Sequence, residues 1–222
     1  ARRWPQRSRS VDEILREVDE LQAREIVLVA QDLASYGKDV DGMGAGSIVP
    51  LVEAVAARVR RTRLLYLYPS DLSDRLADAI CATGVPYFDL SLQHVSPPLL
   101  RRMRRWGDGE RFLQRIERIR RHDPSAAFRS NFIVGYPGET EDDHDELLAF
   151  LGDAALDWAG FFPFSPEDGT PAATLDGAVD DALVAEWLRE CEDVQVPITQ
   201  AGRDELVRVG AEVEVLVDAI ED

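Results

Sequence analysis

Short apolar runs typical of buried strands alternate along this chain with longer segments whose apolar residues recur at helical spacing. The pattern predicts strands at residues 25–30, 64–68, 87–92, 127–134 and 158–164. It predicts helices at 11–21, 48–60, 72–82, 97–105, 109–122, 141–151 and 181–194. Ser10 and Glu13 form a capping box for the first helix, and Gly84 is a stop signal after the third. Regular alternation of this kind predicts an α/β fold with a parallel sheet and right-handed crossovers.

Most of the strands do not alternate polar with apolar residues, so we expect both faces of the sheet to be covered. Polar residues gather instead in the loops that follow the strands. In a parallel sheet these loops meet at one rim, where α/β proteins bind ligands. The loop residues are Gln31 and Asp32, Pro69 to Asp71, Gln93 and His94, the turn at Gly135, and Ser165 to Glu167.

The fourth predicted strand ends abruptly in the turn Gly135-Tyr136-Pro137-Gly138-Glu139. Glycine lets a ligand approach the bare backbone, so this turn is a candidate binding element. Thr140 and Asp143 form a capping pattern for the next helix, and acids suit its positive end. We therefore interpret most acids of this segment as structural, with Glu139 in the turn as the exception.

Among the titratable residues, His94 directly follows a strand and is a candidate site residue. His122 and His144 are expected on helix ends or surfaces. His94 has no neighbouring cysteine or histidine at ligand spacing, which argues against a protein-only zinc site. The two cysteines, Cys81 and Cys191, lie in helical patterns and are interpreted as buried thiols.

Two other motifs have simple structural interpretations. The glycine-rich segment Gly42–Ser47 lacks the Gly-Lys-Ser/Thr of a P-loop and is predicted to be a flexible loop. The basic run Arg101–Trp106 could contact RNA phosphates or an acidic protein, but a solvated helix face is the simpler interpretation.

The chain has 222 residues, 45% of them apolar, and a net charge of −17. This acidity argues against general nucleic-acid binding and fits a cytoplasmic protein or one with a basic partner. No apolar run is long enough for a membrane helix, and no signal peptide is expected. Both ends of the sequence look like cuts, since it begins without methionine and ends within a strand-like pattern.

Residues 195–200, which include Pro197, are predicted to form a hinge. Beyond it, residues 209–220 alternate like a half-buried antiparallel strand, the start of a small β domain. The expected domains are therefore residues 1–195 and a truncated unit at 196–222.

Five ordered segments resemble the methylthiotransferases of the radical S-adenosylmethionine (SAM) superfamily. The resemblance runs from about residue 8 to the chain end. The segments are Glu25–Asp32 with Tyr36-Gly37, Leu65–Pro69, Ser91–His94, Arg129–Thr140 and Phe164–Ala172. Ala-Gln-Asp, Leu-Tyr-Leu-Tyr-Pro and Ser-Pro-Glu-Asp-Gly-Thr are similar to the branch that modifies an aspartate of small-subunit ribosomal protein twelve. The alternatives are tRNA-adenosine methylthiolation and a cluster-free descendant that only binds protein or RNA.

The resemblance implies a (β/α)6, TIM-like radical SAM barrel whose first strand is missing, followed by the start of a TRAM β domain. It implies SAM and two 4Fe–4S clusters as cofactors and a small-subunit ribosomal protein as substrate. It also implies site residues. Gln31 and Asp32 would hold the SAM amino group and Arg129 its carboxylate. Gly135 to Gly138, with Pro137 between them, would pass under the adenine, and Glu139 would belong to the same cofactor-binding turn. Gln93 and His94 would line the cavity.

The main departure is the absence of the superfamily's Cys-x3-Cys-x2-Cys loop, whose third cysteine would fall a few residues before Ala1. Cys81 and Cys191 cannot replace it, because three thiolates must converge on one cluster. We expect the chain alone to bind no cluster and to be inactive. The sequence identifies neither the electron donor nor the sulfur donor.

Overall fold

In a computed structural model of the chain, described at residues 7–30, 32–40 and 48–217, five parallel strands form one sheet in the order β1-β2-β3-β4-β5. The strands are β1 (Glu25–Leu28), β2 (Arg61–Leu67), β3 (Tyr87–Gln93), β4 (Ala127–Val134) and β5 (Trp158–Pro163). The α-helices are α1 (Val11–Leu21), α2 (Ile48–Ala56), α3 (Asp74–Cys81), α4 (Pro97–Arg102), α5 (Gly109–His122), α6 (Glu141–Ala154) and α7 (Asp181–Arg208). Short 3-10 helices are η1 (Leu33–Ser35) and η2 (Pro171–Thr174). The predicted parallel α/β fold is confirmed.

Local signals in the sequence explain where several elements begin and end. Ser10 and Glu13 form the predicted capping box of α1, and Thr140 and Asp143 form a second one at α6. Each box satisfies backbone N–H groups that have no partner inside the helix. Gly84 has φ +77° shortly after α3, a conformation that glycine adopts without strain.

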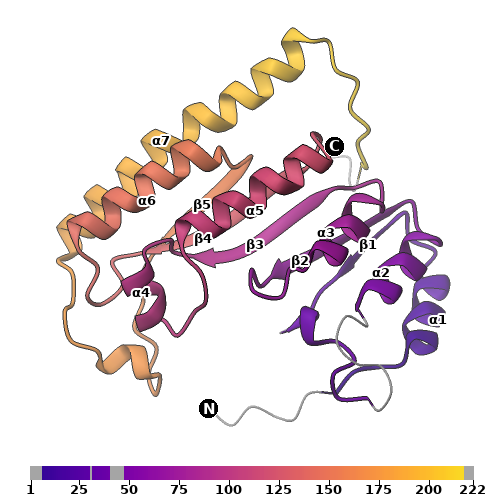
Figure 1. Cartoon of the computed structure of the whole chain (residues 1–222), viewed down its shortest axis with the longest axis horizontal. Helices are drawn as coiled ribbons and strands as arrows, with labels where there is room; N and C mark the ends of the chain where they lie inside the picture. Colours follow the sequence, from indigo (N-terminus) through magenta and orange to yellow (C-terminus); the bar gives the residue numbers. More distant parts are fainter. Residues whose placement is uncertain (1–6, 31, 41–47, 218–222) are drawn as a thin grey trace, which may run out of the picture.

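The helices cover only one face of the sheet. Figure 1 shows them arranged in chain order around the outside of the strands. Along β4, Phe128, Phe132 and Val134 are buried, whereas Arg129 and Ile133 between them are only partly buried. The expectation that both faces are covered is therefore wrong for the described part of the chain. Apolar residues such as Ile133 also occur on the second face, which hid the alternation in the sequence.

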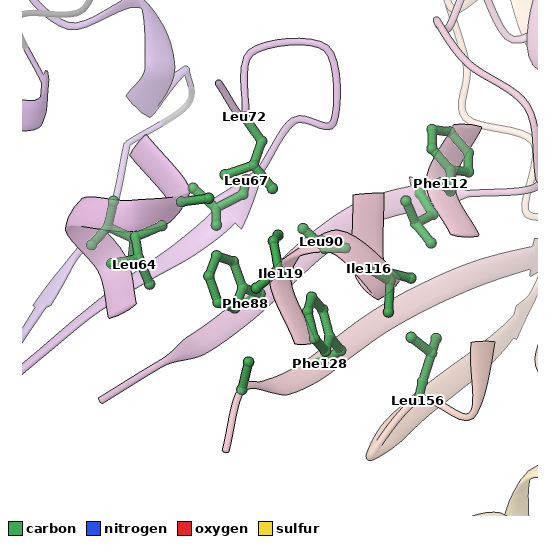
Figure 2. Packing of buried hydrophobic residues seen from close by; sticks show 14 of the residues in the cluster. Leu64, Leu67, Leu72, Phe88, Leu90, Phe112, Ile116, Ile119, Phe128 and Leu156 are labelled. Atoms are coloured by element: carbon green, nitrogen blue, oxygen red, sulfur yellow. The ribbon is translucent and has the colours of Figure 1, made fainter. Parts of the chain in front are cut away.

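The covered face forms the hydrophobic core. Phe88 of β3 and Phe128 of β4 are stacked with ring centroids 5.2 Å apart. Ile116 and Ile119 of α5 lie over these strands (Figure 2). Because these side chains are removed from water, this face provides most of the sheet's hydrophobic stabilisation.

Helix α7 continues through the segment that the sequence predicts as a hinge. Pro197 lies inside the helix. The side chain of Gln195 donates to the carbonyl oxygen of Leu156 at 2.8 Å, and that of Thr199 donates to Asp157 O at 3.1 Å. These bonds tie both sides of the proline to the loop before β5, so the helix persists despite the lost backbone donor. The prediction of a hinge is wrong, while the division into domains at residue 195 stays a prediction.

The chain after α7 is irregular as far as it is described. Residues 211–217 form neither helix nor strand, and Val213, Val215 and Val217 are exposed. A strand needs a neighbour to satisfy its backbone groups, and this segment has none among the described residues. The predicted strand is therefore not formed here, and residues 218–220 lie outside the described part. None of the helices in the described ranges is long and apolar enough to cross a membrane.

Candidate functional site

The glycine turn after β4 is organised by one carboxylate. Glu139 Oε2 accepts from the backbone N–H of Gly135 at 2.6 Å and from that of Tyr136 at 3.1 Å. The backbone N–H of Ser96 donates to His94 Nδ1 at 3.1 Å, so the ring proton is on Nε2. His94 Nε2 then donates to Glu139 Oε1 at 3.2 Å. The loop after β3 and the turn after β4 are thereby joined.

His94 and Glu139 are interior residues. Both side chains have 0% exposure, and their polar atoms satisfy each other and the turn's backbone. They lie together, as the sequence predicts, but the structure gives them a role in fixing the backbone of the turn. Whether they also contact a ligand stays a prediction.

The two glycines of the turn are required by the protein's own packing. Gly135 has φ +79°, and a Cβ there would lie 2.4 Å from Cγ2 of Val184 in α7. Gly138 has φ +87°; its Cβ would lie 3.0 Å from Nε of Arg102, and its N–H donates to Gly177 O at 2.6 Å. The close neighbours of these glycines are thus segments of the chain itself, which the sequence-based interpretation did not foresee.

The uncovered side of the sheet, called the open face, contains alternate residues of the strands, most of which are partly or largely exposed, while Asp89 is buried. Its members include Glu25, Arg63, Tyr87, Asp89, Ser91, Arg129, Asn131, Ile133, Trp158, Gly160 and Phe162. Trp158 is 50% exposed and Phe162 is 53% exposed, so no described segment covers them. The predicted residue Arg129 lies on this face, whereas Gln93 is the last residue of β3, where the shifted register pairs it with Phe132.

The open face is irregular near the carboxyl ends of β2 and β3. The pairing register shifts between Leu64 and Leu67, and again between Leu90 and Gln93. Tyr66 and Gln93 have φ values of +59° and +69°, which is the left-handed region. Bulges and left-handed residues other than glycine cost free energy and are concentrated at binding sites. The sequence did predict Gln93 as a site residue, but it did not predict this strain.

Asp89 anchors the irregular strand end beneath the surface. Its Oδ2 accepts from the Tyr66 N–H at 3.4 Å and lies 3.6 Å from Nη1 of Arg129. Burial raises the pKa of Asp89, and this effect exceeds the opposing attraction of Arg129. Because Arg129 already lies beside Asp89, a carboxylate ligand that binds Arg129 as predicted must compete with Asp89. That contact stays a prediction.

Asn131 is a candidate that the sequence-based interpretation missed. Its Oδ1 is buried and has no hydrogen-bond partner among the described residues. It lies beside Gly160 of β5, where an added Cβ would be 2.8 Å away. Asn131 is two residues beyond Arg129, and residues at that spacing share a face of a strand. This spacing was the signal that could have identified it.

The remaining predicted positions have simpler surroundings. Asp32 is exposed and caps η1, where its Oδ1 accepts from the Ser35 N–H at 3.2 Å. Gln31 and the glycine-rich segment Gly42–Ser47 lie outside the described residues, so their predicted roles are untested. His144 lies near the start of α6, at a helix end as predicted, but it is buried rather than on the surface. It stacks on Trp187 at 4.8 Å and pairs with Glu190 at 2.9 Å, which joins α6 to α7.

The two cysteines do not form a cluster site. Cys81 is in α3 and Cys191 is in α7, and both are free thiols. Burial raises the pKa of Cys191 to about 12, so it is not available as a thiolate ligand. No group of three His, Cys, Asp or Glu side chains in the described ranges could hold a metal ion. The residues present do not fit a 4Fe–4S cluster.

A cleft of about 380 Å³ lies elsewhere, between α3 and α5 on the helix-covered side. Its charged walls are paired with each other, for example Arg118 with Asp74 and His122 with Asp78. It contains none of the predicted site residues. The open face and its rim therefore remain the candidate site.

Comparison of sequences relates the chain to known proteins. Residues 1–151 match the Radical SAM superfamily. The chain is 45% identical over 222 residues to the ribosomal protein uS12 methylthiotransferase RimO of Kineococcus radiotolerans, and 46% identical over 203 residues to that of a Nocardioides species. These alignments include 97% and 90% of the chain but only 45% and 42% of the relatives. The chain thus spans less than half the length of the curated relatives it matches.

Solved structures share the fold at low sequence identity. The radical SAM methyltransferase TsrM of Kitasatospora setae, solved with cobalamin and a 4Fe–4S cluster, aligns with a TM-score of 0.57 and 16% identity over 74% of the chain and 33% of TsrM. Coproporphyrinogen III oxidase HemN of Escherichia coli, described as a radical SAM enzyme, aligns with a TM-score of 0.55 and 13% identity over 90% of the chain and 44% of HemN. Because residues 1–151, more than half of the chain, match the Radical SAM superfamily, the chain belongs to this superfamily, and its sequence relatives confirm the resemblance to the methylthiotransferases.

Proposed function

We propose that the protein containing this chain is a methylthiotransferase that modifies an aspartate of ribosomal protein uS12. The observation that carries this proposal is the 45% identity to a relative of that name along 97% of the chain. Several further relatives with the same name are 41–46% identical over most of the chain. The net charge of −17 also favours a basic partner.

Two structural observations support the binding of SAM at the open face. Asn131 offers a buried acceptor oxygen that no described residue uses, and Gly160 beside it has no Cβ, which would lie 2.8 Å from that oxygen and displace it. When bound, SAM would supply the deoxyadenosyl group that takes a hydrogen atom from the substrate. In this proposal Asn131 and Gln93 bind its polar groups at the rim, and Asp32 and Gln31 bind its amino group.

The buried pair His94 and Glu139 would act by positioning. Together they hold the loop after β3 and the turn from Gly135 to Gly138 in one arrangement. A ligand above the turn then meets preorganised backbone, which lowers the entropy lost on binding. Arg129 would bind the carboxylate of SAM by exchanging its contact with Asp89 for a stronger charged hydrogen bond.

The iron–sulfur chemistry is not assigned to residues of this sequence. A cluster would need ligands other than Cys81 and Cys191, which lie in separate helices and are partly or fully buried. We accordingly place the binding and orientation of SAM and substrate in this chain. The same proposal puts the protein in the cytoplasm, where uS12 is available.

Mass spectrometry of uS12 from a strain that lacks the gene tests the proposal. We expect the methylthio group on the aspartate to be absent and to return when the full-length gene is supplied. Supplying a gene whose product carries Glu139→Ala should restore little modification, because the turn loses its central acceptor. A fully modified uS12 in the deletion strain, or a tRNA that has lost its methylthio group, would contradict the proposal.

A further inference from the structure

One arginine is held over the carboxyl ends of β2 and β3 by the loop that follows α4. The guanidinium of Arg105 donates through Nη2 to the carbonyl oxygen of Ser91 and lies 4.7 Å from the centre of the Tyr68 ring. The hydroxyl of Tyr68 accepts from the Trp106 N–H at 3.1 Å. Arg104 has φ +57°, which lets the loop turn back over the strands. These contacts fix the plane and the position of the guanidinium.

Arg105 has no counter-charge in the described part of the chain. Its side chain is half-buried, yet it forms no ion pair there, whereas its neighbours Arg102 and Arg111 pair with Asp176 and Asp108. Burial lowers the pKa of Arg105, and only Tyr68 opposes this effect. A guanidinium stays charged at physiological pH, so a partly desolvated one without an anion costs free energy. An anionic ligand would remove that cost.

The position of Arg105 adds a reason to expect a ligand. Its acceptor, Ser91, lies inside the register shift between Leu90 and Gln93. The neighbouring strand end contains the left-handed residue Tyr66. Arg105 therefore belongs to the most irregular part of the rim, where the open face would receive a ligand.

The chemistry of the group points to a carboxylate. The flat guanidinium presents paired donors that match the two oxygens of a carboxylate, and stacking on Tyr68 keeps this fork oriented. We propose that Arg105 binds the carboxylate of the substrate's target aspartate at the rim and so selects aspartate over asparagine. Since this role presupposes the proposed function, the test must separate the two. SAM also has a carboxylate that Arg105 could bind, so the affinity of each variant for SAM is measured separately.

The experiment uses the full-length protein with its cofactors and two fluorescent peptides. Both peptides span the target loop of uS12, one with the native aspartate and one with asparagine at that position. A charged hydrogen bond corresponds to a preference for the aspartate peptide of about tenfold to a hundredfold. Arg105→Gln should remove this preference and leave the affinity for the asparagine peptide unchanged. Arg105→Lys should retain part of it, and the control Arg101→Gln, an exposed arginine of α4, should retain all of it.

Thermal melting confirms that each variant is folded, and equilibrium dialysis measures the affinity for SAM. The role of Arg105 is overturned if Arg105→Gln keeps the preference for the aspartate peptide. It is also overturned if the substitution weakens the binding of both peptides equally, or weakens only the binding of SAM. If the protein without substitutions binds neither peptide, the proposed function fails, and the role of Arg105 fails with it. If that protein binds both peptides equally, the proposed function stands and the role of Arg105 is refuted.

Discussion

The two faces of the sheet differ in how far the chain itself supplies packing and hydrogen-bond partners for their residues. On the covered face, Phe88 and Phe128 are stacked and fully buried, and helices complete their surroundings. On the open face, Asn131 has an acceptor without a described partner, and Phe162 is 53% exposed. The covered face is packed by the chain's own residues, with Oγ1 of Thr62 as an atom that has no described partner, whereas the open face combines an unpaired polar atom with exposed aromatic rings and strained backbone. We infer that the covered face serves stability and the open face serves binding.

The largest expected effect is on stability. Phe128→Ala should lower the free energy of unfolding by about 3–5 kcal/mol, because it leaves a cavity in the packed core. Phe162→Ala, on the open face of β5, should lower it by less than about 1 kcal/mol. Urea unfolding of the two variants measures the difference. Equal losses would show that the open face is also part of the stabilising core.

Next in size is the effect of filling the glycine turn. Gly135→Ala should cost roughly 2–4 kcal/mol, since the residue has φ +79° and its Cβ would overlap Val184. Gly152→Ala is the matched control, because this glycine lies in α6 with open space around it and should stabilise the helix by about 0.5–1 kcal/mol. Thermal unfolding tests both. If Gly135→Ala were harmless, the packing of α7 would not explain this glycine.

A smaller effect is expected at Asp89, where the open face keeps a buried carboxylate. Its folded-state pKa is raised by burial, so the native protein is penalised at every pH above that pKa. Asp89→Asn should therefore raise stability at pH 7, by less than the changes expected for Phe128→Ala and Gly135→Ala. The gain should shrink as the pH falls through the raised pKa towards the ordinary value of 3.8.

Urea titrations at several pH values measure this gain. A loss of stability at pH 7 that disappears only as the pH falls below the ordinary value of 3.8 would mean that the attraction to Arg129 dominates. The difference between the faces would then be weaker than we infer, because a charged pair on the open face would itself stabilise the fold.

The covered face could be predicted from the sequence because it depends on local apolar periodicity. The bounds of α1 and β4 and the parallel order of the strands follow from this signal. The continuation of α7 through Pro197 could not, since it depends on hydrogen bonds from Gln195 and Thr199 to a loop distant in sequence. Tertiary contacts of this kind override local breaking signals.

The candidate site was predictable only in part. His94 and Glu139 were identified by their places after strands, but their burial and mutual bond depend on how two loops meet. Likewise, the sequence suggested that the glycines make room for a ligand. In the structure Gly135 packs against Val184, a residue far from it in the sequence. The bulges at Tyr66 and Gln93 have no sequence signal, because neither residue type favours the left-handed region.

The most direct test compares two buried oxygens, one on each face, that have no hydrogen-bond partner among the described residues. Asn131→Ala removes the one on the open face, and Thr62→Val removes the one from Thr62, a fully buried residue of β2. Equilibrium dialysis of SAM with the cluster-loaded, full-length protein should show about tenfold weaker binding for Asn131→Ala and unchanged binding for Thr62→Val. Neither variant should lose stability. Unchanged SAM affinity in Asn131→Ala would contradict the assignment of the open face as the binding site.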